Sequence, residues 1–117
     1  MSEYHEHVAV ISWANSVLGL YPELALLYHP ASGEYRPKPT ARRLKAMGVK
    51  PGVPDLHLPV PRGGYCGLWV ELKYGSNKPT ANQTWWIGQL TALGHKCYIC
   101  WSFEEAVRII TEYLAEQ

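Results

Sequence analysis

The chain has 117 residues, of which 47% are hydrophobic, and a net charge of +1 at pH 7. This length and composition favour one folded domain over residues 1–117 and leave no room for a second domain of ordinary size. The near-neutral charge argues against a protein that coats nucleic acid nonspecifically.

Membrane and secretory classes are also disfavoured. No apolar run approaches the ~20 residues that a membrane-spanning helix needs, so we expect no membrane association. The segment from Met1 to Glu6 lacks the basic and apolar regions of a signal peptide. The cysteines number three, an odd count that favours reduced thiols over a disulfide framework. We therefore expect a cytoplasmic protein.

The first half of the chain predicts a helix, a strand and a second, shorter helix. Apolar side chains recur at helical spacing over residues 5–18, and Gly19 ends that helix. Residues 24–29 are largely apolar and predict a buried strand, and the Pro- and Gly-containing residues 30–39 predict a loop. A short basic helix is expected over residues 40–47.

The middle of the chain predicts a β-hairpin. Residues 56–60 form one strand, residues 61–64 contain Pro and two Gly and form a turn, and residues 68–73 form the returning strand. Apolar and polar side chains alternate in the second strand, so Glu71 and Lys73 share the face opposite the apolar set.

The last part of the chain predicts helix, strand and helix. Thr80 and Gln83 have the spacing of a capping box, which opens a helix that ends near Leu93. A strand follows over residues 96–101, and Ser102 caps the final helix. This order of elements is typical of an α/β fold.

Two segments of the hairpin carry the most specific chemistry. Asp55 stands at the start of the first strand, so the chain reversal brings it toward Glu71. Two carboxylates supply hard oxygen ligands for Mg²⁺ or Mn²⁺, and Lys73 can position an attacking water or neutralise charge on a phosphorus. The pattern indicates phosphodiester hydrolysis. Each half alone also fits a plainer interpretation, a solvated Glu-x-Lys pair and a Pro-Asp turn.

Pro54-Asp55 followed by Glu71-Leu72-Lys73 resembles the signature of the PD-(D/E)XK nuclease superfamily. The next segment, residues 78–86, is similar to the VRR-NUC family, in which a glutamine opens the helix after the catalytic lysine. This resemblance implies a restriction-endonuclease-like αβββαβ core with a mixed central sheet flanked by helices.

The resemblance also implies a function. It suggests a Mg²⁺- or Mn²⁺-dependent DNA endonuclease that is structure-specific for branched DNA such as Holliday junctions. Small stand-alone members of the family, many of them phage-encoded, are associated with such cleavage as homodimers. Two alternatives remain at this stage: a flap-cutting or nicking nuclease, and a noncatalytic nucleic-acid-binding module that keeps the fold.

In this resemblance Asp55, Glu71 and the carbonyl of Leu72 are metal ligands, with Lys73 as the water-positioning or charge-stabilising residue. Gln83 is implied as a supporting catalytic group. The capping box accounts for Gln83 equally well.

A glutamate at the start of the first helix is implied as a further metal ligand. Glu3 and Glu6 are both candidates. The family pattern has a glutamine four residues after this glutamate, and His7 takes that place after Glu3, which favours Glu3 while departing from the pattern. Acidic residues are also favoured at a helix N-terminus by the helix dipole, which accounts for at least one of the two.

A basic segment lies just ahead of the hairpin and could contact DNA phosphates. A solvated helix face explains any one of its residues equally well. The residues implied in DNA binding are Arg36, Lys38, Arg42, Arg43 and Lys45.

His29 and His57 stay outside the predicted site, because a lone strand histidine is more often a hydrogen-bonding residue than a ligand. Adjacent helical residues diverge by about 100°. We therefore expect one of Trp85 and Trp86 to enter the core and the other to remain for stacking or a dimer interface.

Overall fold

A three-stranded mixed sheet is the centre of the computed structural model, which describes residues 2–31 and 38–117. Strand β1 (Leu56–Leu58) pairs antiparallel with β2 (Leu68–Leu72), and β2 pairs parallel with β3 (Lys96–Cys100). The middle strand β2 is buried over its whole length, because it has a neighbour on each side and helices on each face.

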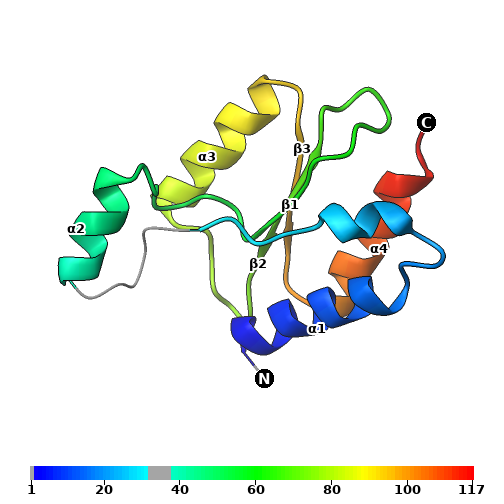
Figure 1. Ribbon diagram of the computed structural model, residues 1–117, viewed down its shortest axis with the longest axis horizontal. Helices are drawn as coiled ribbons and strands as arrows, with labels where there is room; N and C mark the ends of the chain where they lie inside the picture. Colours follow the sequence, from blue (N-terminus) through cyan, green and yellow to red (C-terminus); the bar gives the residue numbers. More distant parts are fainter. Residues whose placement is uncertain (1, 32–37) are drawn as a thin grey trace.

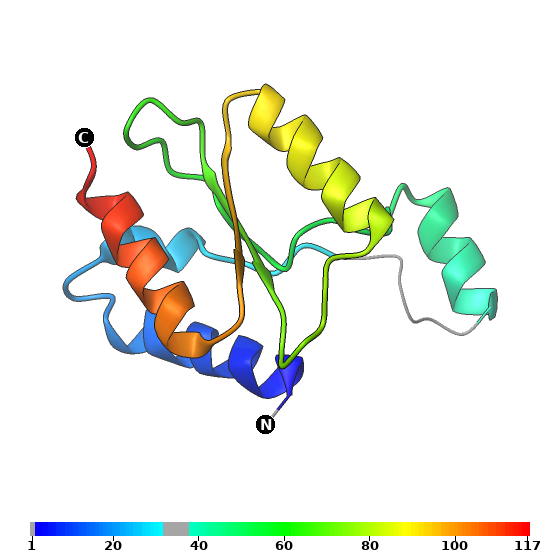
Figure 2. The same cartoon turned by 180° about the vertical axis from the view of Figure 1, so that it is seen from behind.

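Helices cover both faces of this sheet. Helices α1 (Glu3–Ser16) and α4 (Phe103–Ala115) lie together on one face, and α3 (Ala81–Ala92) lies on the other (Figures 1 and 2). Helix α2 (Lys38–Ala46) stands to one side of this body (Figure 1). The prediction of an α/β fold with a mixed sheet flanked by helices is confirmed.

The apolar core lies between the sheet and the pair α1 and α4. Val70 and Leu72 of β2 point into it, as do Val10 of α1 and Ile110 of α4. Because side chains alternate along a strand, Trp69 and Glu71 point to the opposite face, toward α3. The face toward α1 and α4 therefore carries the apolar core, with Lys96 of β3 outside that core, and the face toward α3 carries the buried Glu71.

The prediction of a strand over residues 24–29 is wrong. The segment begins as a 3₁₀ helix, η1 (Pro22–Leu26), and only a single antiparallel bridge, from Tyr28 to His57, joins the rest to the sheet. Pro22 occupies the first helical position, where its fixed φ favours a helical turn. Leu24 is buried whereas Leu26 is exposed, so the run lacks the two-sided burial of an inner strand. The first strand of the expected αβββαβ core is thus reduced to one bridge.

The other predicted elements are present with small shifts at their ends. Helix α1 begins earlier than expected because the Ser2 side chain caps it by accepting from the His5 N–H. The capping box of Thr80 and Gln83 and the cap at Ser102 are confirmed. Within the described residues, no helix has both the length and the apolar character needed to cross a bilayer.

Candidate nuclease site

The predicted site residues of the hairpin converge where β1 begins and β2 ends. Asp55 lies directly before β1, and its Oδ2 accepts a hydrogen bond from the Leu72 backbone N–H over 2.7 Å. The carboxylate thereby takes the place of a backbone acceptor at the end of the antiparallel ladder. This bond fixes Asp55 beside Glu71, the residue that precedes Leu72.

Glu71 is held on the α3 side of the sheet, where it is only 2% exposed. Its Oε2 accepts from Gln83 Nε2 over 2.9 Å and lies 3.3 Å from Lys73 Nζ. Its other oxygen, Oε1, is buried and has no hydrogen-bond partner among the described residues. A buried carboxylate oxygen without a partner is costly unless a cation or a proton satisfies it.

The raised pKa of Glu71 also indicates that its buried carboxylate needs a proton or a cation. Burial, and then the negative charge of Asp55, raise the pKa of Glu71 to about 8, while Lys73 opposes the shift. The single positive charge of Lys73 does not balance the negative charges of both Asp55 and Glu71. A partnerless oxygen, a second carboxylate beside it and a raised pKa together fit a divalent cation, whose preferred ligands are carboxylate oxygens.

Gln83 is the predicted capping-box residue, and its side chain also contacts Glu71 of the predicted site. Its Oε1 accepts from the Thr80 N–H over 2.8 Å, which completes the capping box of α3, and its Nε2 donates to Glu71. The one side chain therefore joins the start of α3 to the middle strand. The amide orients Glu71 by leaving Oε1 as the oxygen without a partner.

A close backbone approach locks the loop before Asp55 against α3. Gly52 has φ +90°, and a Cβ placed on it would lie 2.6 Å from backbone and side-chain atoms of Asn82 in the first turn of α3. Only glycine fits this position without displacement. The approach keeps Asp55 and Gln83, which follow the two contacting residues, near the same end of β2.

The structure separates the two N-terminal glutamates. Glu3 Oε1 lies 3.9 Å from Lys73 Nζ, so Glu3 belongs to the same group of charges. Glu6 Oε2 instead accepts from the Phe103 N–H over 2.7 Å, which satisfies the first turn of α4. The Glu6 carboxylate is thus used to join α1 to α4.

Comparison with known proteins decides the relationship of this fold. No family model matches the sequence, and no curated protein matches it. A solved structure described as "VRR_NUC domain protein" is similar with a TM-score of 0.82 and 26% sequence identity, over 99% of this chain and 90% of that one. The resemblance to the VRR-NUC family is confirmed. This similarity supports a nuclease family in general.

Neither His7 nor His29 was among the predicted ligands, yet the structure brings both to Asp55. One ligand atom each from His7, His29 and Asp55 lie within 4.8 Å of one another. Burial and the neighbouring His29 lower the pKa of His7, and Asp55 opposes this. The sequence signal was the spacing of His7 four residues after Glu3, which puts both on one helix face.

Four of the five basic residues implied in DNA contact belong to helix α2, which stands apart from the sheet (Figure 1). Arg42, Arg43 and Lys45 are exposed there. Arg36 lies outside the described residues. Lys38 opens α2, and its side chain is likewise outside the described part.

The remaining aromatic and histidine residues have structural contacts. His57 stacks on Trp69 with ring centroids 3.8 Å apart, and its Nδ1 is 2.9 Å from the Tyr28 hydroxyl. Burial, and then His95, lower the pKa of His57 to about 4. Trp85 is 59% exposed while Trp86 is half-buried, so α3 presents one tryptophan to solvent.

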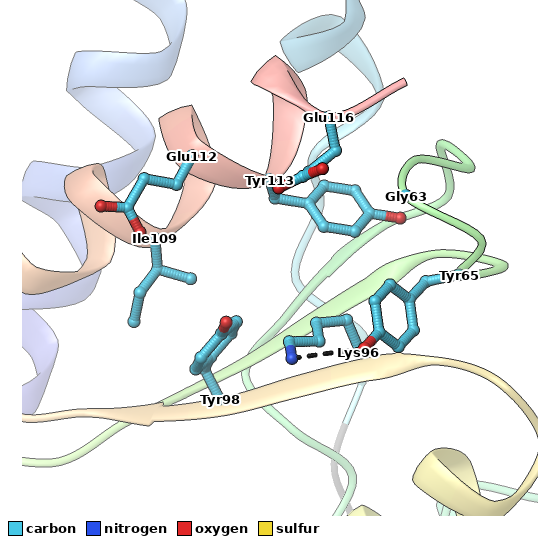
Figure 3. A pocket seen from close by; sticks show the side chains of 8 residues that line it. All are labelled: Gly63, Tyr65, Lys96, Tyr98, Ile109, Glu112, Tyr113 and Glu116. Atoms are coloured by element: carbon cyan, nitrogen blue, oxygen red, sulfur yellow. Dashed lines mark hydrogen bonds between the residues drawn. The ribbon is translucent and has the colours of Figure 1, made fainter.

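A separate cavity of about 260 Å³ lies between α4 and β3 (Figure 3). Lys96 Nζ is 3.5 Å from the Tyr65 hydroxyl and 5.1 Å from the centroid of the Tyr98 ring. The cavity is lined by residues of α4, β3 and the hairpin turn, whereas Asp55 and Glu71 meet on the α3 side of the sheet. It is therefore not the place where Asp55 and Glu71 converge.

Proposed function

We propose that this protein is a Mg²⁺- or Mn²⁺-dependent endonuclease that hydrolyses DNA phosphodiester bonds, with branched DNA such as a Holliday junction as its substrate. The observation that carries the proposal is the convergence of Asp55, Glu71 and Lys73 around a buried carboxylate oxygen without a partner. The VRR-NUC fold supports the nuclease class.

Asp55 and Glu71 would hold the cation, with the Leu72 carbonyl and Glu3 as further oxygen ligands. The fit to a cation rests on two observations. Oε1 of Glu71 has no hydrogen-bond partner among the described residues, and the carboxylate of Asp55 lies beside Glu71. When bound, the cation supplies Lewis-acid activation of the phosphate and of a water. Asp55 is anchored by the Leu72 N–H, so its geometry is set before any ligand arrives.

Lys73 is the group placed to assist the attacking water. Its ammonium is nearly buried between Glu71, at 3.3 Å, and Glu3, at 3.9 Å. These contacts point the only buried lysine of the described residues into the carboxylate group. There the ammonium can orient a water or stabilise negative charge on the phosphate oxygens in the transition state.

Recognition of the DNA would use surfaces outside this centre. Arg42, Arg43 and Lys45 on α2 offer phosphate contacts. Two symmetrical cuts in a four-way junction require two sites, so we propose that a homodimer is the active form. The exposed Trp85 is an apolar residue available to such an interface.

The proposal is tested with labelled four-way junction, flap, nicked and linear duplex DNA, in Mg²⁺, Mn²⁺ or EDTA. We expect paired symmetrical cuts in the junction that require the metal. Glu71→Gln should abolish them, and the matched variant Glu112→Gln, an exposed residue paired with Arg108, should not.

The alternatives give different results in the same experiment. Metal-dependent cleavage restricted to flap or nicked DNA would retain the nuclease and reject the junction substrate. Binding of DNA without cleavage in either metal would reject the nuclease in favour of a binding module. Sedimentation of the protein alone tests the homodimer, since a monomer with junction activity would contradict it.

A further inference from the structure

A cluster of two imidazoles and one carboxylate adjoins the proposed nuclease centre. It is built from His7 of α1, His29 of the segment after η1 and Asp55 ahead of β1. One ligand atom of each residue lies within 4.8 Å of the other two, a spacing that a single ion can bridge with small side-chain movements. Three distant segments of the chain thus contribute one potential donor each.

The hydrogen bonding of His29 prepares its ring for an ion. His29 Nδ1 lies 2.6 Å from the Asp55 backbone carbonyl. A carbonyl can only accept, so Nδ1 carries a proton, and in the neutral ring the lone pair is then on Nε2. Metal-binding histidines commonly donate their other ring N–H to a backbone carbonyl in this way, which fixes the tautomer and the ring orientation.

The two rings are also held relative to each other. The His7 and His29 rings meet edge to face, with centroids 4.7 Å apart and planes at 85°. His7 is half-buried, and it lies one turn after Glu3 on α1. Asp55 uses Oδ2 for the Leu72 N–H, which leaves its second oxygen for another contact.

We propose that His7, His29 and Asp55 form a second cation position, which takes a transition-metal ion of the Mn²⁺, Co²⁺ or Zn²⁺ class in preference to Mg²⁺. Imidazole nitrogen suits these ions, whereas Mg²⁺ prefers oxygen ligands throughout. Three protein donors leave coordination positions open. Asp55 is shared with the nuclease centre, so the effect on cleavage, though not the binding itself, rests on the proposed function.

Because Asp55 is shared by the two cation positions, we expect Mg²⁺ and Mn²⁺ to support cleavage at different rates. Mg²⁺ would occupy the oxygen-lined position alone, whereas Mn²⁺ would occupy both. Filling the second position neutralises charge beside Glu71 and fixes Asp55 from a second side. Cleavage should therefore be faster in Mn²⁺ than in Mg²⁺, and that difference should depend on the two histidines.

Binding is tested with Co²⁺, whose visible absorption reports nitrogen ligands, using His7→Gln, His29→Gln and the double variant. His5→Gln is the matched control, because His5 is an exposed histidine on the same helix outside the cluster. We expect the double variant to lose one bound Co²⁺ and each single variant to lose roughly 10-fold or more in affinity. Wild-type Co²⁺ stoichiometry and affinity in the double variant would overturn the inference.

Folding and function are separated by two further readouts. His7→Gln leaves the bond from His29 to the Asp55 carbonyl intact, so its circular dichroism and unfolding midpoint should match the wild type. Its Mg²⁺-dependent cleavage should persist while its advantage in Mn²⁺ is lost. If the wild type cleaves no DNA but the histidine variants lose Co²⁺ binding, the second cation position is supported and the nuclease is rejected. If the wild type cleaves DNA and His7→Gln keeps the full advantage in Mn²⁺, the nuclease is supported and the second position is rejected.

Discussion

The two faces of the sheet use buried residues of the same strand for opposite purposes. On the face toward α1 and α4, Val70 and Leu72 pack into an apolar core. On the face toward α3, Glu71 of that strand is equally buried, with a carboxylate beside it and an oxygen without a partner. Burying apolar groups stabilises the fold, whereas burying charge costs stability. We therefore expect the face toward α1 and α4 to supply most of the stability, and the buried carboxylate on the α3 face to serve the proposed nuclease site.

The largest contrast is expected for Asp55→Asn, a change at the chain's one aspartate. The amide keeps the shape of the side chain and removes the charge that the proposed cation needs. We expect cleavage to fall by about 10³-fold or more, on the scale of losing an essential electrostatic group, and calorimetry to show no Mg²⁺ binding. Undiminished cleavage by this variant would remove Asp55 from the site.

The apolar face should show the reverse pattern. Ile110→Ala opens a cavity under α4, where the side chain is fully buried. We expect a loss of about 2–5 kcal/mol in the free energy of unfolding, measured in urea. Cleavage per folded molecule should change little. A large drop in that rate would mean that the two faces are not independent.

The pH dependence of stability should report on Glu71. Its pKa is raised from 4.5 to about 8 in the fold, so the folded state holds this proton more tightly than the unfolded chain does. In EDTA, this contribution to stability is full below pH 4.5 and is lost as the pH rises through 8, an effect on the order of a few kcal/mol.

Glu71→Gln should flatten that part of the profile, because the amide does not titrate. Added Mg²⁺ should raise the stability of the wild type most above pH 8, where the Glu71 carboxyl has lost its proton and binds the ion without competition. A wild-type profile that is already flat between pH 5 and 8 would contradict the raised pKa.

A smaller effect is expected where α3 meets the sheet. Gln83→Ala removes the bond from the Thr80 N–H and the bond to Glu71 together, whereas Thr80→Ala removes only the bond from the Gln83 N–H to the Thr80 hydroxyl. Both should lower the unfolding free energy by about 1 kcal/mol. Only Gln83→Ala should also slow cleavage, by roughly 10-fold if one hydrogen bond of about 1.4 kcal/mol is lost. Equal rates for the two variants would confine Gln83 to a capping role.

Local patterns made the hairpin and its carboxylates predictable from sequence. Alternation placed Glu71 and Lys73 on one face, and the turn at residues 61–64 brought Asp55 back toward them. The capping box of Thr80 and Gln83 and the cap at Ser102 were equally local. The capping role of Gln83 is present in its contacts, and its bond to Glu71 places it beside the predicted site, where its catalytic role stays a prediction.

Contacts between distant segments were not predictable in this way. The Glu6 carboxylate caps a helix 97 residues later in the chain, which no local pattern indicates. His29 meets Asp55 because the antiparallel bridge from Tyr28 to His57 joins two segments that are far apart in the sequence. The spacing of His7 after Glu3 was a local signal, whereas the contact of His29 with Asp55 depends on the fold.

The central claim is tested most directly by single-turnover cleavage of a labelled four-way junction in Mg²⁺ by the wild type, Lys73→Met and Lys96→Met. Lys73 is buried between Glu71 and Glu3, and Lys96 lies on β3 in the separate cavity. We predict that Lys73→Met binds the junction and loses cleavage, while Lys96→Met cleaves as the wild type does. Cleavage by Lys73→Met at the wild-type rate would contradict the assignment of the nuclease site.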